Sequence, residues 1–406
     1  MALHIQEYLQ VMPDVVRVPA FDPKPETGWQ GVEALCYEGA PYHGEQTGIF
    51  AYIGFPKMEK GAKVPAVVLV HGGGGHAYAH WVKLWNDRGY AAIAMDTTGF
   101  YPAQECIGLA GKECGAHEQY TREPYGELEG KGYIAGPNND GLLDSMDLPV
   151  EEQWMYHAIV DTVLAHNILL NDKRIDRDKI GICGISWGAV ITSLALGYDT
   201  RYAFAIPIYG CAFLEEAPES LAFCDRFKAN TIKELWCATG RLSEVKIPVY
   251  WMCTLIDRCF CCTSNSRSYL ATKGSGAAFS ICYDLIHGHY HAWDREEGYR
   301  FADAVLRHEL PFICAETEPE GSGKVQFRIL IPDDFQDVAV SLVYLKEAFR
   351  YDEKGNLLSA YERIPAQLDH GVVSAEIPQD AYGYYFEFSG CVHQKHMISS
   401  TAFVEV

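Results

Sequence analysis

The 406-residue chain is long enough for a large hydrophobic core and for more than one domain. Its hydrophobic fraction of 48% and charged fraction of 21% are those of a globular protein rather than a disordered one. A net charge of -21 argues against nucleic acids and anionic membranes as partners, because phosphate groups would be repelled over most of the surface. The sequence shows no secretory signal in Met1–Asp14 and no apolar stretch long enough to span a bilayer.

Fourteen cysteines are spread through apparent core strands, which favours free thiols in a reducing cytoplasm over a disulfide scaffold. The tightest cluster is Cys259, Cys261 and Cys262, with Cys253 just upstream. A zinc site there is an alternative, although no C-x-x-C pair with a matching second half is present. We interpret these residues as buried or half-exposed thiols.

Residues 1–31 carry four prolines and no regular pattern. We expect them to form an extension that lies across the surface without joining a sheet. Val32–Tyr37 and Gly48–Gly54 are apolar runs on either side of a turn-rich segment, which predicts an antiparallel hairpin.

Ala66–Val70 is a continuous apolar run that predicts a buried strand, and it ends in His71 and four glycines, Gly72–Gly75. A glycine-rich loop after a strand can turn backbone N–H groups toward an anion, as in one half of an oxyanion hole. A phosphate-binding loop is the alternative, but the lysine and the Ser/Thr of that motif are missing.

Helix and strand signals then alternate. Ala77–Arg88 predicts a helix and Tyr90–Asp96 a buried strand, so a right-handed parallel crossover is expected. Residues 97–150 lack periodicity and follow the carboxyl end of a strand, where open α/β sheets bind ligands, so we interpret them as a pocket-forming insertion. Candidate substrate contacts in it, for which a plain surface-loop position is equally open, are Tyr101, Tyr133, Asn138 and Asn139.

Glu151–Leu170 predicts a long amphipathic helix that leads into the apolar strand residues 180–183. Gly184–Gly188 follows that strand with the pattern G-x-S-x-G, and an apolar helix comes after it. A serine in such a strand-to-helix turn has an exposed hydroxyl, and the flanking glycines avoid clashes. We therefore predict that Ser186 is a nucleophile; the alternative is a chance match of common residues.

Three further buried strands are predicted at Ala203–Tyr209, Ile247–Leu255 and Ala278–Leu285. Asp257 follows the second of them. In hydrolases with a serine in such a strand-to-helix turn, the acid of the catalytic triad stands after a strand that follows this turn, so Asp257 is the candidate acid; a turn-forming aspartate is the alternative. The chain order Ser, Asp, His is that of an α/β-hydrolase triad.

Three alternating histidines follow the last of these strands, and any of them could be the base. We favour His289, because the Gly288–His289 pair lets the loop place the imidazole over the serine; His287 comes second and His291 third. A metal site built from the three rings is an alternative, although no carboxylate or fourth ligand stands at zinc-like spacing.

Residues 316–324 form a linker rich in Glu, Pro, Gly and Ser, and the pattern beyond it changes. Short β-rich runs separated by turns predict a small β-sandwich-like domain over residues 323–406, after a catalytic domain over residues 32–315. We expect the β domain to serve packing or dimer formation, with sugar binding as the alternative.

From about Val32 to Leu310 the chain resembles the α/β-hydrolases of the acetyl xylan esterase, dienelactone hydrolase and prolyl-oligopeptidase-like group. The resemblance rests on His71–Gly75, Trp81, Trp85, Arg88–Tyr90, Asp96, Gly184–Gly188, Asp257 and His287–Trp293. It implies an α/β fold with a mostly parallel, doubly wound sheet and a triad of Ser186, Asp257 and His289. It also implies an oxyanion hole from the Trp187 N–H and an N–H of the glycine loop, at Gly74 or Gly75.

The resemblance predicts a serine-dependent carboxylester hydrolase that removes acetyl or another short acyl group from a carbohydrate or small molecule. The scheme requires no metal or organic cofactor. Two alternatives remain open: a serine peptidase of prolyl-oligopeptidase type, and a non-catalytic carbohydrate-binding protein that retains the fold. A homo-oligomer is compatible with all three.

Overall fold

The computed structural model describes residues 4–102, 120–122, 131–139, 144–216, 224–228, 230–257, 259–352 and 357–406. The chain divides into two compact units, Met1–Ala205 and Ile206–Val406, and the division falls inside strand β9 (Phe204–Ile208). This division differs from the sequence-based boundaries of 32–315 and 323–406, which follow linker composition and stay a prediction.

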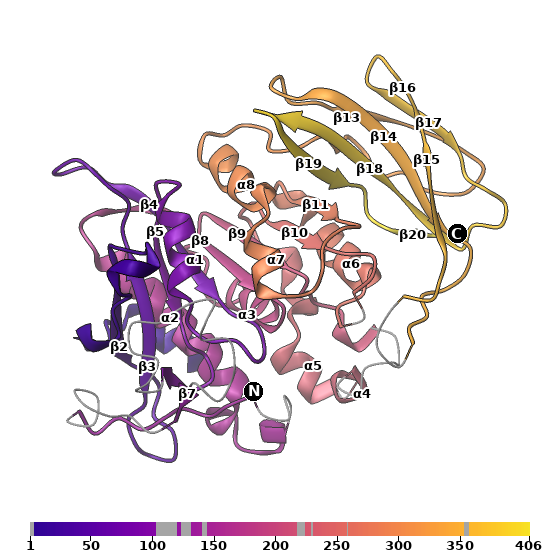
Figure 1. The fold of residues 1–406 in the computed structure, drawn as a ribbon. Coiled ribbons are helices and arrows are strands. Elements are labelled where there is room, and N and C mark those ends of the chain that lie inside the picture. Colours follow the sequence, from indigo (N-terminus) through magenta and orange to yellow (C-terminus); the bar gives the residue numbers. More distant parts are fainter. Residues whose placement is uncertain are drawn as a thin grey trace. The chain divides into compact units, whose positions relative to one another are not determined.

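The first unit is built on a mixed sheet with the strand order β1-β2-β3-β5-β4-β8 (Figure 1). The β1–β2, β2–β3 and β3–β5 pairs are antiparallel, whereas β4 pairs in parallel with both β5 and β8. The strands are β1 (Val15–Arg17), β2 (Val32–Glu38), β3 (Gly48–Gly54), β4 (Val64–Val70), β5 (Ala91–Met95) and β8 (Ile175–Ile185). The longer helices are α1 (Ala79–Asn86), α2 (Trp154–Asn171) and α3 (Trp187–Ala195), and β6 (Tyr101–Pro102) pairs with β7 (Tyr120–Thr121).

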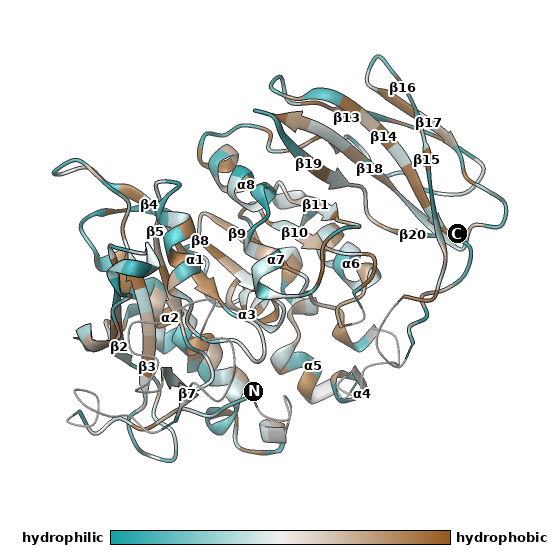
Figure 2. Cartoon of the chain, viewed as in Figure 1, coloured by the Kyte–Doolittle hydropathy of each residue, from teal (hydrophilic) through white to brown (hydrophobic). Residues whose placement is uncertain are grey.

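The central strands are apolar on both faces. All five residues of β5 and the last six of β8 are buried, as expected for parallel strands that helices cover on both sides. Figure 2 shows β3 and β8 largely in the brown of hydrophobic residues. The predicted hairpin and the predicted parallel crossover from β4 through α1 to β5 are confirmed.

The amino-terminal segment does join the sheet, so the prediction that it stays outside was wrong. Val15–Arg17 forms β1, which pairs antiparallel with β2 and places Val16 opposite Cys36. Pro13 and Pro19 flank this three-residue strand rather than interrupt it, so no ladder hydrogen bond is lost.

Helix α2 is buried all round, whereas the sequence suggested an amphipathic helix. Every residue from Trp154 to Leu170 is buried, polar residues included. The 3-10 helix His4–Gln10 packs against α2, and the Asn167 side chain donates hydrogen bonds to the carbonyls of Tyr8 (2.8 Å) and Val11 (2.7 Å). Asn167 is therefore covered by the amino-terminal segment, whereas the buried His166 of the same helix lies 2.8 Å from the Asp199 carboxylate. Periodicity reports neither of these tertiary contacts.

The second unit continues the α/β pattern with three parallel strands in the order β9-β10-β11. Strand β10 spans Tyr250–Cys253 and β11 spans Ala278–Ile281. The helices are α4 (Cys224–Phe227), α5 (Asn230–Trp236), α6 (Cys262–Thr272), α7 (His289–Trp293) and α8 (Glu296–Leu306). The three predicted strands are thus confirmed, each a little shorter than expected.

The carboxy-terminal part of this unit consists of two antiparallel sheets, as predicted. One has the order β12-β13-β17-β16, and the other β15-β14-β18-β19 with β20 paired to β18 (Figure 1). Side chains of both sheets, among them Phe327, Leu342 and Phe386, share one hydrophobic core. The strands are β12 (Cys314–Ala315), β13 (Lys324–Leu330), β14 (Gln336–Leu345), β15 (Tyr361–Pro365), β16 (Gln367–Asp369), β17 (Val372–Glu376), β18 (Gly383–Val392), β19 (Lys395–Ser400) and β20 (Val404–Glu405). The β-rich runs expected from the sequence correspond to β13, β14, β17, β18 and β20, whereas β12, β15, β16 and β19 were not predicted.

These two sheets, called the β module below (β12–β20), pack against the α/β part of the same unit. The Ser280 hydroxyl of β11 donates to the Ile398 carbonyl of β19 (2.7 Å), and the Ile281 N–H donates to the Ser400 hydroxyl (3.0 Å). The Ile398 N–H donates in turn to the buried Glu297 carboxylate of α8 (3.3 Å). Within the described residues, no helix has the length and apolar character needed to cross a membrane.

Candidate active site

Ser186 sits at the junction of β8 and α3 in a strained backbone conformation. Its φ of 58° and ψ of -122° lie in a region that residues other than glycine rarely adopt. Such strain persists only where the surrounding structure holds it, and it is characteristic of a nucleophile elbow. The side chain is 8% exposed, so the hydroxyl lies at the edge of the core rather than in open solvent.

The two glycines of the elbow are required by close backbone packing. A Cβ atom at Gly184 would lie 2.2 Å from the Gly188 carbonyl oxygen. A Cβ atom at Gly188 would lie 2.1 Å from the Val70 carbonyl oxygen and 2.4 Å from that of His71. The G-x-S-x-G pattern is therefore a packing requirement that brings the start of α3 against the end of β4 and its glycine loop.

Two sets of backbone N–H groups lie next to this contact. Trp187 is the first residue of α3, where N–H groups point out of the helix and favour negative charge. In the glycine loop the Gly75 N–H donates to the Gly72 carbonyl (3.0 Å), and Gly74 has a φ of 68°. A positive φ at the third residue of such a turn calls for glycine. The Gly75 N–H is thus used inside the turn.

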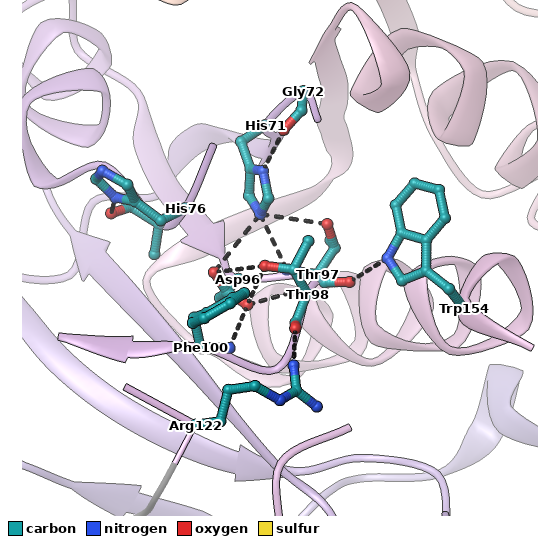
Figure 3. A network of polar contacts seen from close by, with 10 residues as sticks. His71, Gly72, His76, Asp96, Thr97, Thr98, Phe100, Arg122 and Trp154 are labelled. Carbon is teal, nitrogen blue, oxygen red and sulfur yellow. Dashed lines mark hydrogen bonds and ion pairs between the residues drawn. The ribbon is translucent and has the colours of Figure 1, made fainter. Parts of the chain in front are cut away.

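His71 fixes the glycine loop from beneath (Figure 3). Its Nδ1 lies 2.8 Å from the Gly72 carbonyl oxygen, and its Nε2 accepts a hydrogen bond from the Thr97 N–H (3.0 Å). An Nε2 that accepts from a backbone N–H carries no proton, so the ring is neutral with its proton on Nδ1. Burial lowers the pKa of His71, which keeps the ring in this form.

The hydrogen-bond network continues from Thr97 to its neighbours Asp96 and Thr98 and to Trp154 (Figure 3). Asp96 Oδ1 accepts from the N–H groups of Thr98 (2.8 Å) and Phe100 (2.9 Å), which closes the turn after β5. Trp154 donates its indole N–H to the Thr97 carbonyl (2.7 Å), and its ring meets that of Trp187 edge to face at 6.1 Å. Hydrogen bonds and ring contacts therefore link the glycine loop to the residue after Ser186.

Arg122 joins two parts of the insertion that are distant in the sequence. Its guanidinium donates to the Thr98 carbonyl (2.7 Å) and also bonds to the Gly136 carbonyl. Arg122 was not predicted as a structural residue. Nothing in the sequence around an arginine in an aperiodic loop indicates which distant carbonyls it will contact.

In the second unit, Asp257 and His287 form a hydrogen-bonded pair. Asp257 follows β10 and is 3% exposed, and its Oδ1 accepts from the N–H groups of Cys259 (2.7 Å) and Phe260 (3.2 Å). Its Oδ2 lies 2.8 Å from His287 Nδ1. One carboxylate oxygen is thus fixed by the backbone and the other orients an imidazole, as expected of a triad acid.

The histidine that contacts the acid is His287, the second choice of the sequence analysis, and not the favoured His289. His289 is the first residue of α7 and its ring lies 6.1 Å from that of Trp293, while His291 is on the same helix. Because the helix begins at residue 289, His287 is the one of the three that still lies in the loop after β11.

Aromatic rings hold the His287 imidazole in place. The Tyr209 ring stacks on it at 4.4 Å with an interplanar angle of 27°, and the Phe260 ring lies 6.1 Å away at 14°. The Tyr209 hydroxyl accepts from the Gly288 N–H (3.1 Å). Tyr209 itself has a φ of 33°, a strained value of the kind found at functional sites. Neither ring contact has a local signal in the sequence.

The β module reaches this pair through one side chain. The Tyr351 hydroxyl donates to the backbone carbonyl of Asp257 (3.0 Å). Burial raises the pKa of Tyr351, so the hydroxyl remains a donor. Because 94 positions separate the two residues, the sequence around either one does not indicate this contact.

The candidate substrate residues differ in what they can still contact. Tyr101 has no exposed surface and donates its hydroxyl to the Gly48 carbonyl (2.7 Å), so it supports β3. Tyr133 is buried beside Gly48, where a Cβ atom would lie 2.6 Å from its ring. Asn138 and Asn139 are half-buried. The rest of the insertion, at 103–119, 123–130 and 140–143, lies outside the described residues.

A mostly parallel central sheet with a strained serine between a strand and a helix defines an α/β-hydrolase fold. Residues 24–216, slightly less than half of the chain, match the family model of acetyl xylan esterases (AXE1). A comparison with curated protein sequences gives no match.

The chain is also similar to several solved structures. The acetyl xylan esterase from Paenibacillus sp. R4 has a TM-score of 0.50 at 18% identity, over 74% of this chain and 90% of that chain. An acetyl xylan esterase from Thermoanaerobacterium sp. JW/SL YS485 has a TM-score of 0.49 at 15% identity, over 74% and 93%. An acylaminoacyl peptidase from Pyrococcus horikoshii gives 0.48 at 18%, over 68% and 42%. The chain therefore has the α/β-hydrolase fold, with an added carboxy-terminal β module.

Proposed function

We propose that the chain is a serine-dependent carboxylester hydrolase that removes acetyl or another short acyl group from a carbohydrate or small molecule. The observation that carries the proposal is the strained Ser186 in an intact elbow, together with an Asp257–His287 pair built as an acid and an oriented base. Ser186 belongs to the first unit and the pair to the second, so the contact between serine and imidazole is part of the proposal.

The proposed reaction is acyl transfer to water through an acyl-enzyme. Ser186 Oγ attacks the ester carbonyl carbon while His287 Nε2 takes the hydroxyl proton. The tetrahedral intermediate then collapses, and the imidazolium gives that proton to the leaving alcohol. Water attacks the acyl-enzyme in the same way, which releases the carboxylic acid and restores Ser186.

Asp257 supports both steps through His287 Nδ1. Its carboxylate accepts the Nδ1–H, so the lone pair of the neutral ring is on Nε2, where the serine proton is taken. The same carboxylate stabilises the imidazolium while it exists. Because two backbone N–H groups already hold Oδ1, the acid stays in place as charge develops.

Backbone donors from two elements would receive the negative oxygen of the intermediate. We assign one to the Trp187 N–H at the start of α3 and the other to the Gly74 N–H, since the Gly75 N–H already donates inside its turn. One such donor is typically worth about 3 to 4 kcal/mol in the transition state.

A short acyl group on a sugar is supported by the match of residues 24–216 to acetyl xylan esterases. Release of acetate from acetylated xylo-oligosaccharides, compared with p-nitrophenyl esters of increasing acyl length, would define both halves of the substrate. A series of aminoacyl anilides run beside them covers the peptidase alternative. Activity on anilides but not on esters would overturn the assignment as an esterase.

The test of the catalytic serine uses two variants in neighbouring turns. Ser186→Ala should abolish hydrolysis of p-nitrophenyl acetate and labelling by a fluorophosphonate probe. Ser193→Ala removes a buried hydroxyl of the same helix, which donates to the Ala189 carbonyl (2.8 Å), and should keep both. If folded Ser186→Ala hydrolyses the ester at the wild-type rate, the elbow is not the catalytic site.

A further inference from the structure

Asp257 and His287 have a third neighbour that the proposed reaction does not use. Asp257, Cys259 and His287 each offer one ligand atom, and the three atoms lie within 4.8 Å of one another. Among the residues that the structure describes, this is the one group of three or more such side chains that meets that distance. It combines a carboxylate, a thiol and an imidazole, which are the ligand types that Zn²⁺ accepts.

Hydrogen bonds hold Asp257, Cys259 and His287 next to one another. The Cys259 N–H donates to Asp257 Oδ1 (2.7 Å), which closes a tight turn and places both side chains at the same loop. Asp257 Oδ2 then faces His287 Nδ1 at 2.8 Å. The arrangement is therefore held by hydrogen bonds before any cation arrives, which lowers the cost of ordering the ligands.

The distances suit a tetrahedral cation after small side-chain shifts. Ligand bonds of about 2.0 to 2.3 Å at tetrahedral angles put neighbouring ligand atoms about 3.3 to 3.7 Å apart. The site also has a solvent side, because the His287 side chain is 30% exposed and Cys259 is half-buried. Asp257 closes the other side with a side chain that is 1% exposed.

The other cysteines of the cluster noted in the sequence are placed differently. Cys261 and Cys262 are buried, and the Cys261 sulfur bonds to the hydroxyls of Thr263 (3.1 Å) and Ser264 (3.2 Å). Cys253 is buried in β10. Of the four thiols, Cys259 is the one that the structure joins to a carboxylate and an imidazole.

We propose that Asp257, Cys259 and His287 form a binding site for Zn²⁺ and similar thiol-binding divalent cations, and that the bound cation reversibly inhibits the hydrolase. A water molecule would complete the four ligands. Binding stands on the geometry alone, whereas inhibition rests on the proposed function, in which His287 is the base.

A cation on either ring nitrogen of His287 would prevent the imidazole from acting as a base. A cation on Nδ1 moves the single proton of the neutral ring to Nε2, so Nε2 no longer has a lone pair for the serine proton. A cation on Nε2 takes that lone pair directly. Asp257 contributes its carboxylate, and Cys259 loses its thiol proton to water, so binding releases that proton.

The experiment measures binding and inhibition separately on the full chain. Co²⁺ replaces Zn²⁺ as the probe, because a thiolate bound to Co²⁺ absorbs in the near ultraviolet. The wild type should show this absorption, and EDTA should remove it. Cys259→Ser keeps the backbone N–H that holds Asp257 but loses the thiolate. The Zn²⁺ concentration that halves the variant's own metal-free activity should therefore rise at least about tenfold.

Three controls keep the outcomes distinct. Cys391→Ser removes another half-exposed thiol and should behave as the wild type. Ser186→Ala should bind Co²⁺ normally although it is inactive, so the binding site is tested even if the proposed reaction is wrong. Equal Zn²⁺ inhibition of wild type and Cys259→Ser, or Co²⁺ binding without thiolate absorption, would overturn the proposal.

Discussion

His287 Nδ1 lies 2.8 Å from Asp257 Oδ2, and this hydrogen bond joins one of the three alternating histidines to the buried carboxylate. Asp257 in turn is fixed by the backbone N–H groups of Cys259 and Phe260. The imidazole is therefore oriented by a carboxylate that cannot turn away without losing two further hydrogen bonds.

Asp257→Asn should lower kcat for p-nitrophenyl acetate by about 10⁴-fold, because an amide does not stabilise the imidazolium and disfavours the proton on Nδ1. Asp284→Asn is the control, since Asp284 is exposed on the loop after β11 and pairs only at the surface with Arg295. Its kcat should not change. A similar loss in both variants would point to a folding defect.

His287→Gln should lower kcat at least about 10³-fold, whereas His289→Gln should lower it less than about tenfold. The reason is that the Asp257 carboxylate orients the first ring, while the second lies at the start of α7. Steady-state rates of both variants, with circular dichroism to check folding, give the comparison. The reverse order of effects would restore His289 as the base.

Tyr351→Phe should lower kcat about three- to tenfold with little change in KM, because one hydrogen bond to the Asp257 carbonyl is worth about 1 kcal/mol. Tyr351 does not touch the reacting atoms in the proposed scheme, so it is a positioning residue. Tyr361→Phe, on the exposed β15, is the control and should keep the wild-type kcat. A rise in KM alone would contradict a role through Asp257.

Gly188→Ala should destabilise the protein by about 1 to 3 kcal/mol or prevent folding, because the added Cβ would lie 2.1 Å from the Val70 carbonyl oxygen. Gly240→Ala places a Cβ where no other atom lies within 4 Å and should change stability by less than about 0.5 kcal/mol. Thermal unfolding of the two variants and the wild type measures the difference. Equal melting temperatures would mean that the elbow relaxes freely.

His157 should make the protein less stable in acid. Burial lowers the pKa of His157 in the folded state to about 4, below the 6.5 of an unfolded chain. Between these values the unfolded chain binds more protons, so stability is full above pH 6.5 and falls until about pH 4. At pH 5 the loss from this residue is about 2 kcal/mol.

The measurement for His157 compares denaturant unfolding at pH 7 and pH 5 in the wild type and in His157→Gln. Glutamine can still donate to the Glu151 carbonyl, which His157 Nε2 contacts at 2.9 Å. The variant should lose less stability between the two pH values. An equal loss would assign the acid sensitivity to other buried histidines, such as His71 and His166, whose pKa burial also lowers.

The elements that carry strong local patterns were predictable. The apolar strand β4 with its glycine loop, the G-x-S-x-G between β8 and α3, and the position of Asp257 after β10 follow from runs and turns of a few residues. Glycine is the one choice at 184 and 188, because a Cβ atom there would lie 2.2 Å from the Gly188 carbonyl oxygen and 2.1 Å from that of Val70, respectively.

Other features depend on segments that are distant in the chain. Asn167 of α2 bonds to the amino-terminal segment, β1 joins the sheet despite its flanking prolines, and Tyr351 supports Asp257 from the β module. No local pattern contains the partner in these cases. The choice among the three histidines is of the same kind, since it depends on where α7 begins and on the ring of Tyr209.

The sequence by itself determined that the chain has an α/β-hydrolase fold with a serine elbow, because periodicity and turn glycines act within single strands and helices. The tertiary structure decided which imidazole meets the acid and which thiol lies beside them. Asp257 and His287 are 30 positions apart, and they meet because β10 and β11 are parallel neighbours whose following loops lie at the same edge of the sheet. This neighbourhood exists only in the folded chain.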